Sequence, residues 1–344
     1  MMKIILVGFG AIGKGVAKVL HEKRDYLKKN YGDFKVVAIT DSSGSAIDEN
    51  GLDLIKAIEV KETTGSIKNY PEKGSEMKSI DVIREVEADV VVEITPSNLE
   101  TGEPAKTHIL ESFRNKKHVV TANKGPLALC YKELVEEAKK HGVMFRHEAS
   151  VGGAMPIINL AKETLAGNEI LSIRGILNGT TNYILTKMEK EGLDFETALK
   201  EAKELGIAET DPTQDIEGLD TAAKIVILAN SIMGLEKTIK DVKVKGITKI
   251  TPEALFLANK RGYTIKLIGQ IKENHLIVEP MLVPIDSPLN VKGTLNVAMF
   301  ETDLAREVVV VGRGAGPVET ASAILSDLIH IYTTINTKQK MKNI

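Results

Sequence analysis

The feature that most constrains this chain is a glycine-rich turn close to its N-terminus. Residues 8–13 read Gly-Phe-Gly-Ala-Ile-Gly, directly after an apolar run at 4–7 and ahead of an amphipathic stretch at 11–29. A second apolar segment follows at 34–40. Strand, helix and strand in this order form a βαβ unit, whose parallel strands need a crossover. The spacing G-x-G-x-x-G in that context is typical of a dinucleotide-binding turn.

Each glycine of this turn has its own physical role. The first permits a tight turn, the second lets the backbone approach a pyrophosphate, and the third lets the helix pack against the strand. The start of the helix then offers unpaired N–H groups and the positive end of its dipole to the phosphates. We therefore expect a dinucleotide cofactor to contact Gly8, Gly10, Ala11, Ile12 and Gly13.

The same turn nearly fits another phosphate-binding motif, the P-loop. Gly8, Gly13 and Lys14 satisfy the pattern G-x4-G-K. The next residue is Gly15, where a P-loop needs a Ser or Thr hydroxyl to hold magnesium. The sequence thus favours dinucleotide binding over phosphoryl transfer.

The identity of the dinucleotide stays open. Asp41 ends the second predicted strand, where a carboxylate can bind the ribose 2′-hydroxyl of NAD. Ser42, Ser43 and Lys56 follow, and hydroxyls with a lysine can instead accept the 2′-phosphate of NADP. Both NAD and NADP are therefore compatible with the sequence.

The first 147 residues alternate strands and helices. Apolar runs at 90–94, 118–122 and 143–146 are each preceded by a helical stretch, at 79–87, 107–114 and 130–141. The region at 42–75 is rich in Ser, Gly, Asp and Glu, and we expect an irregular excursion there with a weak helical patch. The alternation predicts an α/β fold with a Rossmann-type, doubly wound parallel sheet in residues 1–147.

The pattern changes after residue 147. Strand-like and helical segments then follow one another as in an α+β domain, and we predict a second domain at 148–304 with an antiparallel sheet. A valine run leads into the glycine-rich turn at 312–316, and a helix follows. We expect residues 305–344 to return to the first domain.

Composition excludes several classes of protein. The chain has 344 residues, of which 43% are hydrophobic and 27% are charged, with a formal net charge of −2. These values are ordinary for a globular protein and argue against a nucleic-acid binder. The single cysteine, Cys130, rules out a disulfide framework and fits a reducing compartment, the cytoplasm. No apolar run reaches the roughly 18 residues of a membrane span, so we expect no membrane partner. The partner that we expect is a small-molecule substrate.

Two polar loops follow strands of the predicted parallel sheet. Thr95-Pro96-Ser97 comes after the strand at 90–94, and Asn123-Lys124 comes after the strand at 118–122. Ligands bind outside the carboxyl ends of such strands. We therefore expect Thr95 to contact the cofactor and Lys124 to lie at the cofactor or the substrate.

The segment at 209–224 carries five acidic side chains and one lysine. Asp220 and Lys224 are four residues apart and share one face of the helix that begins there. That helix continues with Ile-Val-Ile-Leu-Ala, which indicates burial. A lysine at the start of a buried helix, paired with an aspartate, can act as a proton donor. The alternative is a capped helix behind a solvated acidic loop.

Taken together, these residues resemble the homoserine dehydrogenase family. The resemblance covers nearly the whole chain and rests on residues 8–13, 121–124, 148–157, 175–184, 209–224 and 312–316. It implies reversible, NAD(P)-dependent hydride transfer between L-homoserine and L-aspartate 4-semialdehyde, in threonine and methionine biosynthesis. It also implies a homodimer whose second domain provides the substrate-binding and dimerisation surfaces.

The resemblance assigns further roles residue by residue. Lys224 and Asp220 are implied at the substrate, and Lys124 is implied between cofactor and substrate. Our hypothesis for the mechanism is that Lys224 stabilises the substrate oxygen and gives up a proton, with Lys124 as its rival and Asp220 orienting Lys224. The implied substrate contacts are Glu209, Asp215, Gly179, Thr180 and the backbone at Ile207. Gly316 is implied at the nicotinamide side of the cofactor. A monovalent cation, commonly sodium, is implied on the backbone carbonyls of Glu148, Val151, Gly153 and Met155.

Longer members of the family are fused to an aspartate kinase or carry a C-terminal regulatory domain. Nothing in this sequence resembles either, so we expect a monofunctional short form without threonine feedback. Two alternatives remain open. One is a dinucleotide-binding redox sensor without turnover, which has no use for residues 209–224. The other is a dehydrogenase of a different small aldehyde or hydroxy acid.

Overall fold

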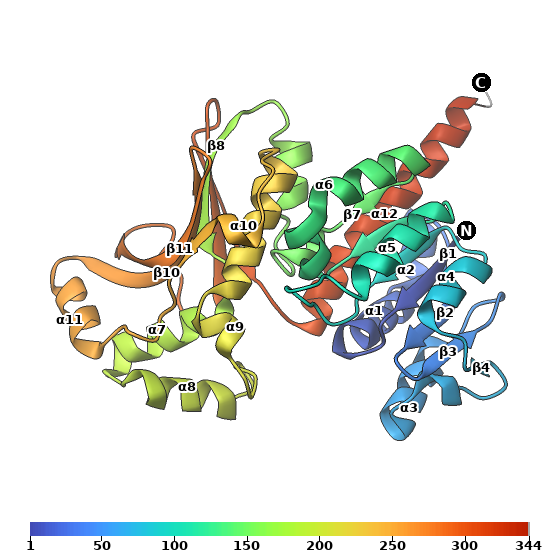
Figure 1. Ribbon diagram of the computed structural model, residues 1–344, viewed down its shortest axis with the longest axis horizontal. Coiled ribbons are helices and arrows are strands. Elements are labelled where there is room, and N and C mark those ends of the chain that lie inside the picture. The colour runs from blue at the N-terminus through green and yellow to red at the C-terminus, as the bar shows by residue number, and fades with distance from the viewer. Residues whose placement is uncertain (343–344) are drawn as a thin grey trace. The chain divides into compact units, whose positions relative to one another are not determined.

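The computed structural model describes residues 1–342, and the chain divides into two compact units (Figure 1). The first unit runs from Met1 to Gly153 and resumes at Gly316, and the second spans Ala154–Ala315. The sequence placed the return to the first unit at residue 305. It begins later because the strand Glu307–Arg313 still belongs to the sheet of the second unit.

The first unit contains a Rossmann-type, doubly wound sheet. Its seven strands run in the order β4-β3-β2-β1-β5-β6-β7. The five strands from β2 to β7 in that order are parallel to their neighbours, and β3 and β4 add an antiparallel edge. Their bounds are β1 Met2–Val7, β2 Phe34–Asp41, β3 Gly44–Ile47, β4 Gly74–Ser75, β5 Val90–Glu93, β6 His118–Thr121 and β7 Phe145–Arg146.

The helices of this unit differ in detail from the sequence prediction. The stretch at 11–29 is two helices that meet at Lys23, and the excursion at 42–75 contains β3, β4 and a helix that Asp53 caps. The helix expected from residue 130 already begins at Lys124. The bounds are α1 Ala11–Glu22, α2 Arg24–Asn30, α3 Leu54–Thr64, α4 Ser79–Glu85, α5 Ala105–Arg114, α6 Lys124–His141 and α12 Pro317–Lys342, with short 3₁₀ turns at Ile67–Asn69 and Glu148–Ser150.

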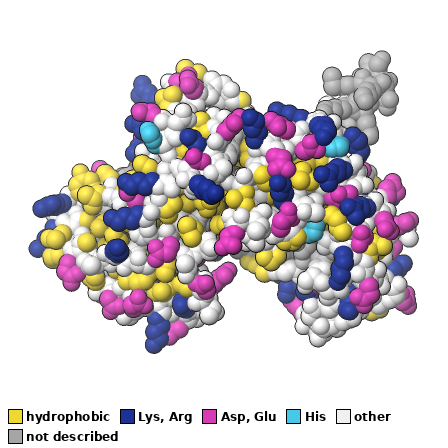
Figure 2. All heavy atoms as spheres, in the orientation of Figure 1, with side chains coloured by type: hydrophobic (Ala, Val, Ile, Leu, Met, Phe, Trp, Pro, Cys, Tyr) yellow, Lys and Arg dark blue, Asp and Glu magenta, His cyan; other side chains and the backbone are white. Residues whose placement is uncertain are grey.

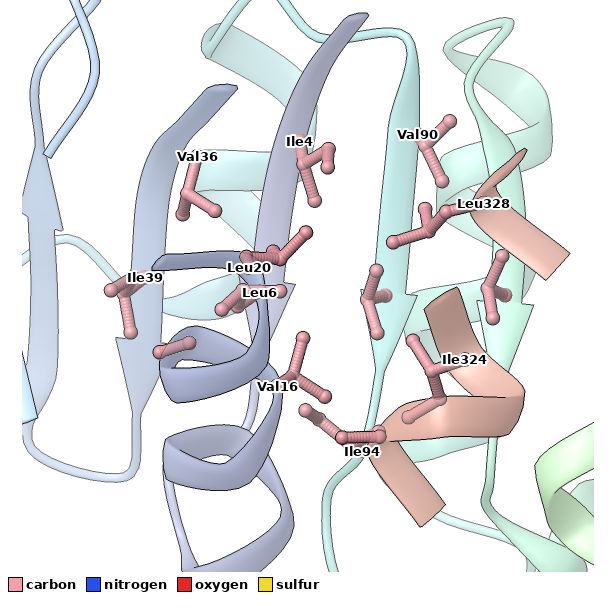
Figure 3. Close-up of a cluster of buried hydrophobic side chains, with 14 of the residues drawn as sticks. Ile4, Leu6, Val16, Leu20, Val36, Ile39, Val90, Ile94, Ile324 and Leu328 are labelled. Atoms are coloured by element: carbon pink, nitrogen blue, oxygen red, sulfur yellow. The ribbon is translucent and has the colours of Figure 1, made fainter. Parts of the chain in front are cut away.

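The core of the first unit contains side chains from both the N-terminal and the C-terminal part of the chain (Figure 3). Ile4 and Leu6 of β1 belong to one buried cluster with Val16 of α1 and with Ile324 and Leu328 of α12. These side chains are at most 2% exposed. Because each buried aliphatic side chain contributes about 1.5–3 kcal/mol, α12 is an integral part of this unit.

The second unit is built on a six-stranded sheet in the order β13-β12-β8-β10-β11-β9. All pairs are antiparallel, as the sequence predicts, except that β9 lies parallel to β11. The strands are β8 Ile170–Ile176, β9 Val242–Val244, β10 Tyr263–Lys272, β11 His275–Pro284, β12 Leu295–Thr302 and β13 Glu307–Arg313. The helices are α7 Gly179–Glu191, α8 Phe195–Glu204, α9 Thr213–Ile216, α10 Leu219–Ile232 and α11 Pro252–Lys260, with single turns at Leu160–Thr164 and Ile239–Asp241.

Helix α10 packs closely on this sheet. A Cβ atom at Gly269 of β10 would lie 2.7 Å from Cγ1 of Ile225, so only glycine lets the helix approach so near. Ile225, Val226 and Ile227 are completely buried. The tight packing on β10 holds the first two turns of α10, which carry Asp220 and Lys224, in place.

None of the helices within residues 1–342 is long and apolar enough to cross a membrane. On the face drawn in Figure 2, acidic and basic side chains are interspersed and no large area of one sign is visible. This distribution agrees with the net charge of −2 and offers no basic surface for a nucleic acid on that face.

Candidate active site

The glycine turn between β1 and α1 has the shape that a pyrophosphate requires. A Cβ atom at Gly8 would lie 2.6 Å from the carbonyl oxygen of Ile94, and one at Gly13 would lie 2.3 Å from the carbonyl oxygen of Gly8. A Cβ atom at Gly10 would meet nothing within 4 Å, so this stretch of backbone faces open space. Gly8 also has a φ of +105°, which residues with a side chain rarely adopt.

The first turn of α1 completes this anion site. Gly10 stands at the N-cap position, and no side chain caps the turn. The N–H groups of Ala11 and Ile12 have no partner within the helix, and the positive end of the helix dipole lies beside them. The residues present therefore fit the pyrophosphate of NAD or NADP.

Asp41 ends β2 with its carboxylate enclosed by donors. The ammonium group of Lys61 lies 2.5 Å from its Oδ2 atom. The backbone N–H groups of Ser43 and Ile67 donate to the same carboxylate over 2.8 and 3.1 Å, and the Ser43 hydroxyl donates as well. Burial by itself raises the pKa of Asp41, but these hydrogen bonds outweigh it and leave the pKa below its usual value.

The lysine beside Asp41 is therefore Lys61 and not Lys56, which the sequence suggested. Lys56 lies over the ring of Tyr70, 5.4 Å from its centroid. Lys61 is near the end of α3 and also donates to the carbonyl oxygen of Gly65 over 2.7 Å. A second lysine, Lys78, lies 3.3 Å from the carbonyl oxygen of Ser42. The turn after β2, where the sequence predicts the ribose of the cofactor, thus has cationic groups from α3 and from the start of α4.

The structure joins the two polar loops at the carboxyl edge of the parallel sheet. The side-chain amide of Asn123 donates to the carbonyl oxygen of Thr95 over 2.9 Å. Its oxygen accepts from the N–H of Gly125 and thereby caps α6. The N–H of Lys124 donates to Oγ of Ser97 over 3.1 Å. Thr95 and Lys124, both predicted from the sequence, therefore belong to one hydrogen-bonded group.

Two further residues of the first unit were singled out from the sequence. Gly316 directly precedes α12, with a φ of +128°. Cys130 lies at a kink inside α6, where its backbone is not helical. Burial raises the pKa of the Cys130 thiol to about 11. The thiol is therefore protonated near neutral pH, which makes it a poor nucleophile.

The second unit places Lys224 in a confined polar position. Its ammonium group lies 2.7 Å from Oδ2 of Asp220, one helical turn earlier. It also donates to the carbonyl oxygen of Leu177, at the end of β8, over 2.6 Å. Only 10% of the Lys224 side chain is exposed. The expected Asp220–Lys224 pair is therefore formed, and it is anchored to the neighbouring strand.

Asn178 links this pair to a second carboxylate. Its side-chain amide nitrogen donates to Oδ1 of Asp215 over 2.6 Å and to Oδ2 of Asp220 over 3.0 Å. Its side-chain oxygen accepts from the N–H of Thr181 and caps α7. The sequence analysis missed Asn178, although an Asn ahead of Gly-Thr-Thr is a helix-start signal.

The remaining expected substrate residues lie around the same group. The Thr180 hydroxyl donates to the carbonyl oxygen of Ile207 over 3.1 Å. Gly179 begins α7, and a Cβ atom there would lie 2.9 Å from the carbonyl oxygen of Thr294. The pKa of Asp215 is raised, first because the carboxyl is buried and second because Asp220 is near. Glu209, by contrast, is solvent-exposed.

The expected cation ligands lie on both sides of the point in the sequence where the first unit ends and the second begins. Glu148, Val151 and Gly153 belong to the first unit, and Met155 belongs to the second. Among residues 1–342, no group of three or more His, Cys, Asp or Glu side chains is arranged to hold a metal ion. A site made of backbone carbonyls has no side-chain signature, so this finding does not test the predicted sodium site.

The fold and these residues define a class of protein. A doubly wound sheet with a glycine turn that fits a pyrophosphate is typical of an NAD(P)-dependent dehydrogenase. The buried lysine–carboxylate pair of the second unit suits proton transfer. Residues 8–148 match a family model described as the NAD-binding domain of homoserine dehydrogenase, and residues 156–329 match the model of homoserine dehydrogenase itself. The chain belongs to the homoserine dehydrogenase family.

Individual relatives agree with this assignment. The chain is 90% identical to a homoserine dehydrogenase of Methanocaldococcus jannaschii, covering 97% of this chain and 99% of the relative. It is 38% identical to an NAD(+)-dependent homoserine dehydrogenase of Pseudomonas canavaninivorans, covering 98% of both chains. A solved putative homoserine dehydrogenase of Archaeoglobus fulgidus is 48% identical with a TM-score of 0.90, covering 96% of this chain and 99% of that one. A hyperthermophilic archaeal homoserine dehydrogenase in complex with NADPH is 31% identical with a TM-score of 0.84, covering 97% and 98%.

Family membership confirms the reaction that the sequence implied. The chain is an NAD(P)-dependent oxidoreductase that acts on a CH–OH group and interconverts L-homoserine and L-aspartate 4-semialdehyde. A redox sensor without turnover and a dehydrogenase of another small aldehyde are therefore not favoured.

Proposed function

We propose that the second unit performs the proton chemistry of this reaction with Lys224 as the donor. The bound nicotinamide cofactor supplies the hydride in the reducing direction. Negative charge then develops on the aldehyde oxygen, and an ammonium group beside it stabilises that charge and gives up a proton. The observation that supports this role is the confinement of the Lys224 ammonium between Asp220 and the carbonyl oxygen of Leu177, at 2.7 and 2.6 Å.

We propose that the carboxylates beside Lys224 bind the polar groups of the substrate. Asp215, with Thr180, Gly179 and the backbone at Ile207, lies close enough to Asp220 to form one polar group. The substrate carries an ammonium group and a hydroxyl, and both can donate to a carboxylate. Glu209 is exposed on the loop ahead of α9 and is proposed as a further acceptor for the same ligand.

Lys124 is the rival proton donor, and mutation separates the two lysines. L-homoserine-dependent reduction of NAD and NADP, followed by the absorbance of the reduced nucleotide, measures turnover. Lys224→Ala is expected to lower kcat by roughly 10²–10⁴-fold. Lys124→Ala should have a smaller effect on kcat. The control is Lys200→Ala, because Lys200 is 79% exposed on α8.

A larger loss of kcat in Lys124→Ala than in Lys224→Ala would transfer the role to Lys124. Activity of Lys224→Ala within a few-fold of the wild type would reject the proposed role of Lys224. In either case, binding of the nucleotide measured separately shows whether the first unit is intact.

We propose that the ribose end of the cofactor site accepts NADP as well as NAD. Asp41 is already neutralised by Lys61, so its negative charge does not repel a 2′-phosphate. The hydroxyl of Ser43 and the ammonium group of Lys78 lie at the same turn. The relatives include one named as NAD(+)-dependent and one solved with NADPH, which supports either cofactor.

We further propose a homodimer, a monovalent cation and a cytoplasmic location. The face of the second sheet opposite α10 carries the exposed Val311 beside the half-buried apolar side chains of Ile277, Met281 and Val309, which suits contact with a second copy. The carbonyls of Glu148, Val151, Gly153 and Met155 remain the proposed sodium ligands, and activity measured with and without sodium tests them. A single cysteine suits the reducing cytoplasm.

A further inference from the structure

We propose that Asn178 is a positioning residue, which holds Asp215 and Asp220 together and sets the pH range in which the pair accepts the substrate. This inference rests on the proposed role of the two carboxylates. In this proposal Asn178 acts through the two carboxylates to which its amide donates, Asp215 and Asp220.

The orientation of the Asn178 amide is fixed by the helix that it caps. Asn178 lies between the end of β8 and the start of α7 and is 6% exposed. Its oxygen accepts from the N–H of Thr181 over 2.9 Å and from the Thr181 hydroxyl over 3.1 Å. The nitrogen must therefore point to the other side. A flipped amide would lose the cap and would aim its oxygen at two carboxylates.

The amide nitrogen has two hydrogens, and each one meets a different carboxylate. Oδ1 of Asp215 is 2.6 Å away and Oδ2 of Asp220 is 3.0 Å away. Oδ2 of Asp220 also accepts from Lys224. Two buried carboxylates repel each other unless donors lie between them. A neutral donor relieves that repulsion without adding charge, so the group of Asp215, Asp220 and Lys224 keeps one net negative charge for a cationic ammonium ligand.

The protonation of Asp215 depends on this arrangement. Its pKa is raised by burial first and by Asp220 second, and hydrogen bonds from Asn178 and Thr180 and the charge of Lys224 oppose the rise. The charged groups that face it are Asp220 and Lys224 on α10, while Glu209 and Asp211 on the preceding loop are exposed. Loss of the Asn178 donor raises the pKa of Asp215 further. The carboxylate is then protonated at a higher pH, and substrate binding is lost there.

Two substitutions separate this role from helix capping. Ser and Asp are both good N-cap residues, so Asn178→Ser and Asn178→Asp preserve the cap. Asn178→Ser removes both amide N–H donors, and Asn178→Asp places a third carboxylate between the other two. The matched control is Asp194→Ser, the same kind of exchange at the exposed N-cap of α8.

The measurement is kcat/KM for L-homoserine against pH, with nucleotide binding measured separately. Asn178→Ser should lower kcat/KM by roughly 10- to 100-fold, and Asn178→Asp should lower it more. The acid limb of the profile should move to higher pH in both variants. Nucleotide binding should not change, and Asp194→Ser should match the wild type.

A folded Asn178→Ser variant with the kcat/KM and acid limb of the wild type would overturn the inference. A loss of activity without any shift of the acid limb would also overturn it, because a merely structural role does not move a titration. Failure of the proposed function would give a different result. Lys224→Ala and Asp215→Asn would then retain activity, regardless of the result for the Asn178 variants.

Discussion

Two lysines of this chain pair with a carboxylate and a carbonyl oxygen, and a third, Lys266, does not. Lys224 lies between a carboxylate and a carbonyl oxygen, and Lys61 lies between Asp41 and the carbonyl oxygen of Gly65. Lys266 is 1% exposed, and its amine donates to two neutral oxygens among the described residues, of Asn182 at 2.7 Å and of Thr186 at 3.4 Å. The sequence singled out Lys224 because its partner is one helical turn away. It could not single out Lys61, because Asp41 is distant along the chain and only the fold brings them together.

The Asp41–Lys61 pair should control the choice of cofactor. In Lys61→Ala the freed Asp41 carboxylate binds a ribose hydroxyl but repels a 2′-phosphate. A charge-assisted hydrogen bond contributes about 1.5–3 kcal/mol, so KM for NADP should rise roughly tenfold or more relative to KM for NAD. The control is Lys56→Ala on the same helix, whose side chain lies over Tyr70. An equal change for both nucleotides would contradict this role.

Lys266 should make stability depend on pH. Burial first, and then the positive charge of Lys292, lower the pKa of Lys266 to about 7. The unfolded chain therefore binds one more proton than the folded chain between about pH 7 and pH 10, and stability due to this residue rises with pH across that window. Urea unfolding should show the stability of the wild type relative to Lys266→Met rising by at most about 1.4 kcal/mol per pH unit. Parallel pH dependences of the two proteins would refute the titration.

Most of the candidate residues lie at starts of helices. Gly10 precedes α1, Asn123 precedes α6 and Asn178 precedes α7. The sequence located the first turn by its glycines but placed the start of α6 too late. The sequence Lys-Gly-Pro suggests a segment that is not helical. Pro126 nevertheless lies in the first turn of the helix, where a missing N–H costs nothing.

Asn123 should support both the start of α6 and the function of Lys124. In Asn123→Ala the cap of α6 is lost together with the hydrogen bonds to Thr95 and Pro96. The free energy of unfolding should fall by about 1–2 kcal/mol, and turnover should fall because Lys124 begins that helix. Asp53→Ala removes the cap of α3 and serves as the control, with a similar loss of stability but unchanged kcat. Unchanged turnover in Asn123→Ala would argue against a functional position for Lys124.

At the scale of the whole molecule, the order of strands and helices predicted one unit better than the other. Alternating strands and helices leave few topologies other than a doubly wound parallel sheet, and the first unit has that sheet. The valine run at 308–311 was harder to assign, because an apolar strand fits a parallel core and an antiparallel edge equally well. Its pairing with β12 places this strand at the edge of the antiparallel sheet. Local periodicity does not reveal such a long-range pairing.

That edge strand offers a test of the proposed dimer. Val311 is 49% exposed on β13, and Val309 lies two residues earlier on the same face of the sheet. A stable dimer buries about 1,600 Å² in total, and a charge in the centre of such an interface has no partner. Val311→Asp should therefore convert a wild-type dimer into monomers, as light scattering coupled to size exclusion would detect. Tyr26→Asp, on α2 of the first unit and 56% exposed in the wild type, should leave the dimer intact. A monomeric wild type, or a Val311→Asp variant with the mass of a dimer, would show that this face is not the interface.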